Sequence, residues 1–127
     1  MRILIAEDVE INWEIISCML EMFGIECERA ENGKICVDMM KKAEEGRYDL
    51  IFMDVQMPQM NGLDAARAIR RLDNSWASSI PIVAMTADAF AENVAECLNA
   101  GMNGHIAKPV DMKLVIKEIR RIKDNLK

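Results

Sequence analysis

Five short apolar segments, each about the length of a strand, alternate with segments of helical periodicity along the chain. The apolar segments lie at 2–6, 25–29, 48–53, 80–85 and 103–107. Each precedes a stretch whose apolar residues recur three or four positions apart, at about 10–23, 32–45, 63–72, 86–101 and 111–124. Strands that alternate with helices pair in parallel, and right-handed crossovers cover both faces of the sheet. The sequence therefore predicts an α/β, doubly wound sheet of five parallel strands with five helices.

The size and charge of the chain limit the number of domains it can form and the partners it can bind. The 127 residues, 51% of them hydrophobic, suffice for one domain, and we expect residues 1–127 to form it without an output domain. The formal net charge of −5 argues against direct binding of nucleic acid, which requires a clustered basic face. Because apolar runs are short and acidic residues come early, we expect no membrane insertion and a cytoplasmic location.

Polar side chains of complementary chemistry end four of the five predicted strands. Glu7 and Asp8 follow the first strand, Asp54 closes the third, and Thr86 and Lys108 end the fourth and fifth. In a doubly wound sheet these strand ends border the functional crevice, so the side chains are predicted to converge. Crowded carboxylates repel one another, and a hard divalent cation such as Mg²⁺ relieves that repulsion. An ionised aspartate can also attack phosphorus and form an aspartyl phosphate.

Each of these signals has a simpler explanation when it is taken alone. Glu7–Asp8 can begin a helix, and Thr86 or Asp88 can cap one. Lys108–Pro109 can form a plain turn, and Asp54 can cap a loop. Their joint occurrence at the ends of the first, third, fourth and fifth strands favours a phosphoacceptor site.

The chain resembles, over essentially its whole length, the receiver domains of two-component response regulators. The resemblance is carried by Ile5-Ala6-Glu7-Asp8, Met53-Asp54-Val55-Gln56-Met57-Pro58-Gln59-Met60-Asn61-Gly62, Ala84-Met85-Thr86-Ala87 and Ala107-Lys108-Pro109. Within the family, the chain looks most like the receivers of hybrid histidine kinases. The resemblance implies a flavodoxin-like sheet with the strand order 2-1-3-4-5.

The same resemblance implies roles for the residues of the crevice. Asp54 would be the phosphoacceptor, and Lys108 would pair with the phosphoryl group. Asp8 would bind Mg²⁺ directly, Glu7 through water and Gln56 through its backbone carbonyl, with Mn²⁺ as a substitute for Mg²⁺.

Switching and lifetime residues are also implied by the resemblance. Thr86 and His105 would form the switch pair, and Gln56 and Asp88 would tune the lifetime of the acyl phosphate. The bond between residue 108 and Pro109 is expected to be cis, a state nearly confined to proline.

The implied partners lie on two surfaces. A histidine kinase or a histidine phosphotransfer domain would donate the phosphoryl group and face the first helix, where Trp13 is a candidate contact. Phosphorylation would reshape the surface of 86–101, 103–107 and 111–124, where a downstream protein would bind. The last helix also carries basic residues that we expect to form a solvated face: Lys113, Lys117, Arg120, Arg121 and Lys123.

Two other functions fit the sequence less well. An aspartyl-nucleophile phosphatase of the haloacid dehalogenase type needs a second acid two residues after the nucleophile, where this chain has Gln56. A pseudo-receiver, an interaction module that takes no phosphate, would not need the acids, Thr86 and Lys108. We therefore expect a phosphoacceptor that is not an enzyme, although it can lose its own phosphate.

Overall fold

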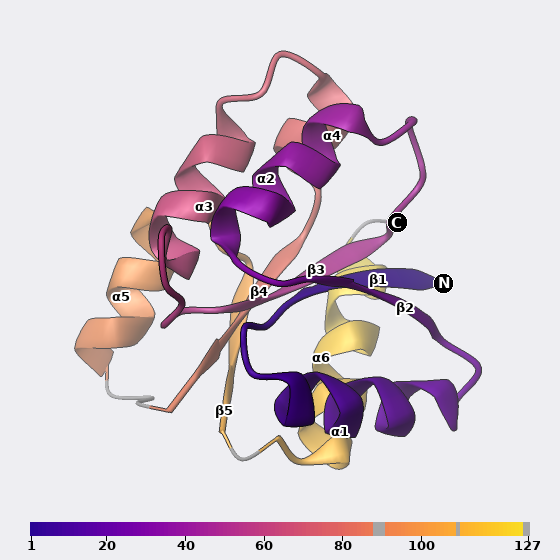
Figure 1. The fold of residues 1–127 in the computed structure, drawn as a ribbon. Coiled ribbons are helices and arrows are strands. Elements are labelled where there is room, and N and C mark those ends of the chain that lie inside the picture. The colour runs from indigo at the N-terminus through magenta and orange to yellow at the C-terminus, as the bar shows by residue number, and fades with distance from the viewer. Residues whose placement is uncertain (88–90, 109, 126–127) are drawn as a thin grey trace.

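The computed structural model describes residues 1–87, 91–108 and 110–125. Its elements follow in the order β1 (Arg2–Ala6), α1 (Glu10–Glu21), β2 (Glu26–Ala30), α2 (Gly33–Lys42), β3 (Leu50–Asp54), α3 (Gly62–Arg70), α4 (Ser75–Ser79), β4 (Ile82–Thr86), α5 (Ala91–Asn99), β5 (Gly104–Ala107) and α6 (Met112–Asn125). The five strands form one parallel sheet in the order β2-β1-β3-β4-β5 (Figure 1). The flavodoxin-like strand order is therefore confirmed.

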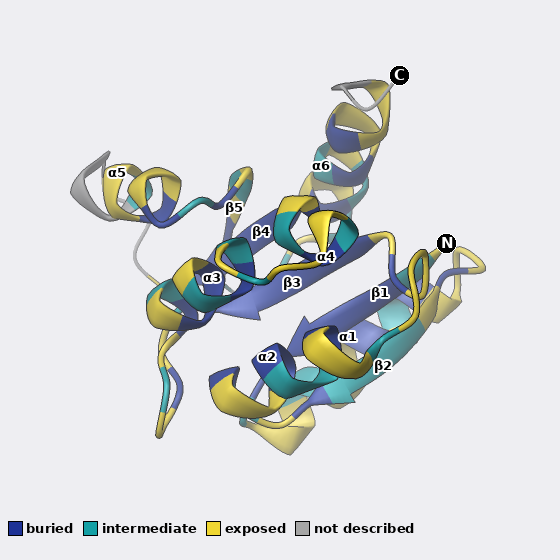
Figure 2. Ribbon diagram, turned by 90° about the horizontal axis from the view of Figure 1, so that it is seen from above, coloured by how far each residue is buried: buried dark blue, intermediate teal, exposed yellow. Residues whose placement is uncertain are grey.

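Both faces of the sheet are covered, because its central strands bury successive side chains on opposite sides. On one face the sheet packs against α2, α3, α4 and α5, through residues that include Leu4, Ala6, Ile51, Met53, Ile82 and Ala84. On the other face it packs against α1 and α6, through residues that include Ile3, Ile5, Leu50, Phe52, Val83 and Met85. Figure 2 shows β1, β3 and β4 as a buried layer between helices whose outer faces are exposed, whereas the edge strand β2 is mostly half-buried. This burial holds the strand ends rigidly side by side.

The prediction of five helices was wrong, because the described residues form six. The extra helix is α4, in a stretch that is too short and polar to show helical periodicity. Two backbone N–H groups of its first turn, those of Trp76 and Ala77, donate to the Asn74 side chain at 2.9 and 3.4 Å. Ala77 is fully buried against the α2–α5 side of the sheet. A capping side chain and tertiary packing therefore create this helix.

Helix α1 differs from its prediction in its first residue, its last residue and the side chains that it buries. Asp8 does not cap it, since the N-cap residue is Val9 and no side-chain hydrogen bond closes the helix start. The helix ends at Glu21, two residues before the predicted end. Ile15 and Phe23 are 52% and 58% exposed, so the apolar spacing of this helix overstates its buried face.

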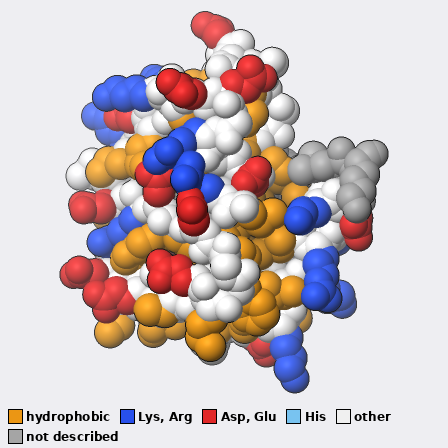
Figure 3. Space-filling view, turned by 90° about the vertical axis from the view of Figure 1, so that its right-hand side faces the viewer, with side chains coloured by type: hydrophobic (Ala, Val, Ile, Leu, Met, Phe, Trp, Pro, Cys, Tyr) orange, Lys and Arg blue, Asp and Glu red, His pale blue; other side chains and the backbone are white. Residues whose placement is uncertain are grey.

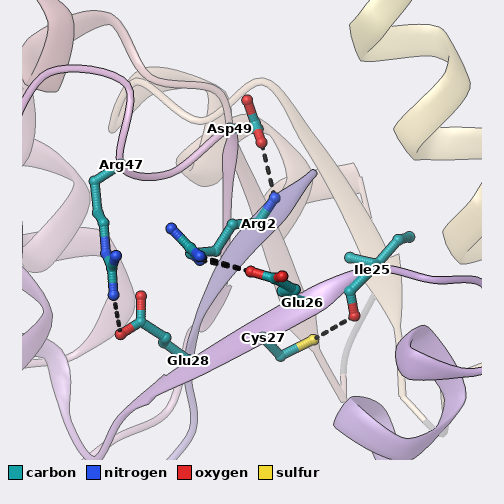
Figure 4. A network of polar contacts seen from close by, with 7 residues as sticks. All are labelled: Arg2, Ile25, Glu26, Cys27, Glu28, Arg47 and Asp49. Atoms are coloured by element: carbon teal, nitrogen blue, oxygen red, sulfur yellow. Dashed lines mark hydrogen bonds and ion pairs between the residues drawn. The ribbon is translucent and has the colours of Figure 1, made fainter.

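The amino-terminal ends of β1 and β2 carry a second group of charges, shown in Figure 4. Arg2 pairs with Glu26 at 2.6 Å, and Arg47 pairs with Glu28 at 2.9 Å. The backbone N–H of Arg2 also donates to Asp49 at 2.8 Å. Each pair joins opposite charges on neighbouring segments, and surface pairs of this kind add little stability. They lie at the end of the sheet opposite to the strand ends at which the acids gather.

No helix among the described residues combines the length and the apolar character that crossing a membrane requires.

Candidate functional site

Three acidic residues meet at the carboxyl ends of β1 and β3. Glu7 and Asp8 follow β1, and Asp54 is the last residue of β3. One carboxylate oxygen from each of the three lies within 4.8 Å of the other two. Parallel pairing places the ends of adjacent strands at one edge of the sheet, so residues almost fifty positions apart become neighbours. The predicted convergence of these acids is confirmed.

Asp54 is held in one position by its own loop. Its residue surface is 5% exposed, and its Oδ1 accepts the backbone N–H of Gln56 at 3.1 Å. The loop then returns to the strand end, where the backbone N–H of Gly62 donates to the carbonyl of Val55 at 2.9 Å. A Cβ atom at Gly62 would overlap the Asp54 carbonyl oxygen, so only glycine fits here. The Asp54 carboxylate is consequently presented to the crevice with little freedom.

Lys108 supplies the positive charge of the site. Its Nζ lies 2.8 Å from Asp54 Oδ2 and 3.2 Å from Glu7 Oε1, and its side chain is 23% exposed. Its backbone N–H donates to the carbonyl of Thr86 at 2.8 Å, which ties the lysine to the end of β4. Partial burial opposes the charge, but hydrogen bonds to Asp54 and Glu7 outweigh it and raise the pKa of Lys108. The ammonium group therefore stays charged at neutral pH.

Glu7 is the most buried acid of the group. The residue is 0% exposed, and its Oε2 has no hydrogen-bond partner among the described residues. Burial, together with the neighbouring Asp54 carboxylate, raises the pKa of Glu7 to about 7, although Lys108 opposes the shift. Without a cation, Glu7 therefore holds a proton over part of the neutral range.

The donor set suits a hard divalent cation. Three carboxylates face one lysine, so two negative charges remain when all of the acids are ionised. The buried Glu7 Oε2 has no partner among the described residues, which fits an atom that a cation or its bound water would satisfy. The group therefore has the oxygen chemistry and the charge of a metal site.

Glu7 should make stability depend on pH. Because the pKa of Glu7 is raised in the folded state, Glu7 contributes to the free energy of unfolding in full below its unfolded pKa, near 4.5. That stabilising contribution is lost as the pH rises to about 7. With a chelator present, we expect wild type to lose free energy of unfolding across this window relative to Glu7→Gln, on the order of 3 kcal/mol. Urea unfolding at several pH values tests this, and parallel curves for the two proteins would contradict it. Adding Mg²⁺ should stabilise wild type more at pH 8 than at pH 5.

The remaining predicted residues lie around this group. Thr86 is buried at the end of β4, and Gln56 is exposed in the loop after Asp54. His105 is exposed and pairs in register with Ala84, so its side chain lies on the same face of the sheet as that of Thr86. Asp88 and Pro109 lie outside the described residues. The predicted cis bond before Pro109 therefore lies outside them too.

Two supporting residues had no predicted role. The Arg29 side chain reaches from β2 and donates to the backbone carbonyls of Glu7 and Asp8 at 3.1 and 3.2 Å. It orients the loop that carries both acids, but a side chain that bonds remote carbonyls leaves no pattern in the sequence. Gly62 stands in a turn-forming Asn-Gly pair, which predicts a turn but not its contact with Asp54.

Comparison with known proteins agrees with this geometry. The response regulator receiver domain family matches residues 3–120. The chain is 44% identical over 113 residues to the osmosensing histidine protein kinase SLN1 of Saccharomyces cerevisiae, which covers 87% of the chain but only 9% of the yeast protein.

Two solved structures at 32% identity share the fold. One is the receiver domain of a sensor histidine kinase from Pseudomonas aeruginosa, with a magnesium ion in its active site cleft (TM-score 0.83, 94% of each chain). The other is the receiver domain of the yeast response regulator Ssk1, crystallised with the histidine phosphotransfer protein Ypd1 (TM-score 0.81, 94% of this chain and 86% of that one). With the fold, the acids and the family match in agreement, the chain belongs to the response regulator receiver domain family.

Proposed function

We propose that Asp54 accepts a phosphoryl group from a phosphohistidine, carried by a histidine kinase or a histidine phosphotransfer protein. The observation that carries this proposal is the Asp54 carboxylate itself, buried and held between the Lys108 ammonium group and two further acids. An Asp54 oxygen attacks phosphorus, the phosphorus–nitrogen bond breaks, and the imidazole leaves and takes up a proton.

Each neighbouring group has a task in this transfer. Glu7, Asp8, Asp54 and the Gln56 carbonyl would hold Mg²⁺, or Mn²⁺ in its place, and the bound ion would supply positive charge to the phosphoryl oxygens. Lys108, already 2.8 Å from Asp54, would neutralise another phosphoryl oxygen. Positioning and charge neutralisation are the main requirements of phosphoryl transfer, and the site offers both.

A small acyl-phosphate donor tests the proposal without any partner protein. We expect wild type incubated with the donor and Mg²⁺ to gain the mass of one phosphoryl group, measured on the intact protein. The same mixture with a chelator should show almost no gain, because the uncompensated acids would repel the donor. A chain that gains no phosphate with Mg²⁺ present would be a pseudo-receiver.

Thr86 and His105 are proposed as the residues that transmit the change. The Thr86 hydroxyl would donate to the new phosphoryl oxygens, and His105 would move on the same face of the sheet toward the space it leaves. The affected surface would then be α5, β5 and α6, which correspond to the last two helices and the last strand of the predicted fold. Gln56, and Asp88 outside the described residues, are proposed to set how quickly water removes the phosphate.

The phosphodonor is proposed to dock on the amino-terminal half of α1. Ile11 and Ile15 are 62% and 52% exposed, whereas Trp13 is half-buried and packs on the core between α1, α6 and the sheet. A cavity of about 430 Å³ brings Ile15 together with Glu7 and Lys108. An apolar surface next to the acids suits a protein that must bring its phosphohistidine to Asp54.

Ile11→Glu, on the same exposed surface of α1 but outside the cavity that Glu7 and Lys108 line, separates docking from chemistry. We expect phosphotransfer from a phosphorylated histidine phosphotransfer protein to fall about tenfold or more, because the charge replaces an apolar contact at the interface. Phosphorylation by the small acyl phosphate should stay within about twofold of wild type. Ile35→Glu, the same change at a residue of α2 that is 37% exposed, is the matched control. Equal phosphotransfer to both variants would place the docking surface elsewhere.

A further inference from the structure

A groove between the end of α1 and the first turns of α6 is separate from the phosphoacceptor site. Its volume is about 460 Å³, and it is lined by Phe23, Met112, Lys113, Ile116, Lys117 and Arg120. None of these residues belongs to the acid cluster or to the cavity beside Ile15. An inference from this groove therefore goes beyond the phosphoacceptor function.

The floor of the groove leaves apolar surface in contact with solvent. Phe23 is 58% exposed and the preceding Met22 is 83% exposed, and Met112 and Ile116, which line the groove with Phe23, are only partly buried. Isolated exposed apolar residues are common, but a cluster that includes an aromatic ring beside a hollow is typical of a binding surface. Figure 3 shows hydrophobic side chains over the lower part of this side of the molecule.

Positive charges border the apolar floor on one side only. Lys113, Lys117 and Arg120 stand four and three residues apart, so they share one face of α6. None of the three forms an ion pair within the part of the chain that the structure describes. In Figure 3, Lys and Arg side chains stand along the right-hand edge of the hydrophobic area. Unpaired cations are notable here because the chain as a whole carries a net charge of −5.

We propose that this groove binds an acidic amphipathic helix of a partner protein. The apolar face of such a helix would cover Phe23 and Ile116, and acidic residues along one flank would meet the basic row. Lys113 and Arg120 are seven positions apart on α6, which corresponds to about 10 Å along the helix axis and matches acidic residues two turns apart on a bound helix.

Other forms of the partner fit the groove less well. A β-strand partner would need an unpaired strand edge, but the sheet edges are β2 and β5, and neither lines the groove. A flat anionic membrane surface would meet the cations without filling the hollow between the two helices. A fully solvated basic face, as first expected for this helix, does not account for the exposed Phe23 beside it.

Two synthetic helical peptides of about five turns test the proposal. Both carry the same stripe of Leu, which in one peptide is flanked by Glu and in the other by Lys. We expect fluorescence anisotropy to show wild type binding the Glu peptide at least about tenfold more tightly than the Lys peptide, with a preference that weakens in salt. Phe23→Ala should weaken binding of the Glu peptide about tenfold, because it removes the aromatic anchor.

Charge variants make the test independent of the aromatic substitution. The double variant Lys117→Glu with Arg120→Glu should lose the preference for the Glu peptide, whereas Lys41→Glu on α2 should keep it. Circular dichroism of each variant establishes that it is folded.

Equal binding of the two peptides by wild type, or an unchanged preference for the Glu peptide in the double charge variant, overturns the proposal. It is also overturned if only anionic vesicles bind, or if wild type forms a dimer that Phe23→Ala dissolves. Phosphorylation of Asp54 by acyl phosphate should be the same in all of these variants, so failure here leaves the proposed function standing.

Discussion

Asp54→Asn is expected to abolish the phosphoryl mass gain that wild type shows with Mg²⁺ and an acyl-phosphate donor. The amide oxygen is a poor nucleophile toward phosphorus, but it can still accept from the backbone N–H of Gln56, whereas the amide NH2 takes the place of the oxygen that accepts from Lys108. Because Lys108 keeps its contact with Glu7, the variant should fold and lose the chemistry. Intact-mass measurement over time gives the result directly.

The matched control is Asp73→Asn, at an exposed position outside the acid cluster. It should gain phosphate at the wild-type rate. If Asp54→Asn gained phosphate as wild type does, another residue would be the acceptor and the proposed function of the site would be wrong.

Lys108→Met is expected to have the second largest effect, on both rate and stability. The lysine is the one described cation within ion-pair distance of Glu7 and Asp54, so its loss leaves the acids without a counter-charge. We expect the rate of phosphorylation to fall about 100-fold or more, as when one donor to a developing charge is removed. Without a divalent cation, the free energy of unfolding should fall by on the order of 2 kcal/mol, because Glu7 can relieve part of the repulsion by taking up a proton.

Two measurements separate these effects. Urea unfolding with and without Mg²⁺ should show that the cation stabilises Lys108→Met more than wild type, since it takes over the missing charge. Lys42→Met on α2, an exposed lysine, should change neither stability nor rate. A wild-type rate in Lys108→Met would show that the lysine has no part in the transfer.

The sheet and the acid cluster could be predicted because both follow from local patterns and one rule of topology. Alternating strand and helix segments imply parallel strands, and parallel strands place their carboxyl ends at one edge. Asp54 and Lys108 each stand at such an end, and their contact at 2.8 Å confirms that they meet.

Other features depend on contacts that periodicity does not encode. Helix α4 forms because Asn74 caps it and Ala77 is buried, although its five residues show no repeat. In α1, packing against the sheet buries Ser17 and leaves Ile15 exposed, since the neighbouring strands and α6 set the rotation of the helix. The exposed Phe23 and the groove beside it follow from that rotation and from the position of α6.

By itself, the sequence determined a parallel sheet through its alternation of strands and helices, and it determined which chemical groups end each strand. The strand order 2-1-3-4-5 was implied by the resemblance to receiver domains. The tertiary structure alone decided how strongly those groups perturb one another. Glu7 and Lys108 are separated by 101 positions, yet their side chains are 3.2 Å apart. The pKa of Glu7, about 7, results from its complete burial and from Asp54 beside it. Burial and distance are properties of the packed chain, because they depend on residues that are remote in the sequence and adjacent only after folding.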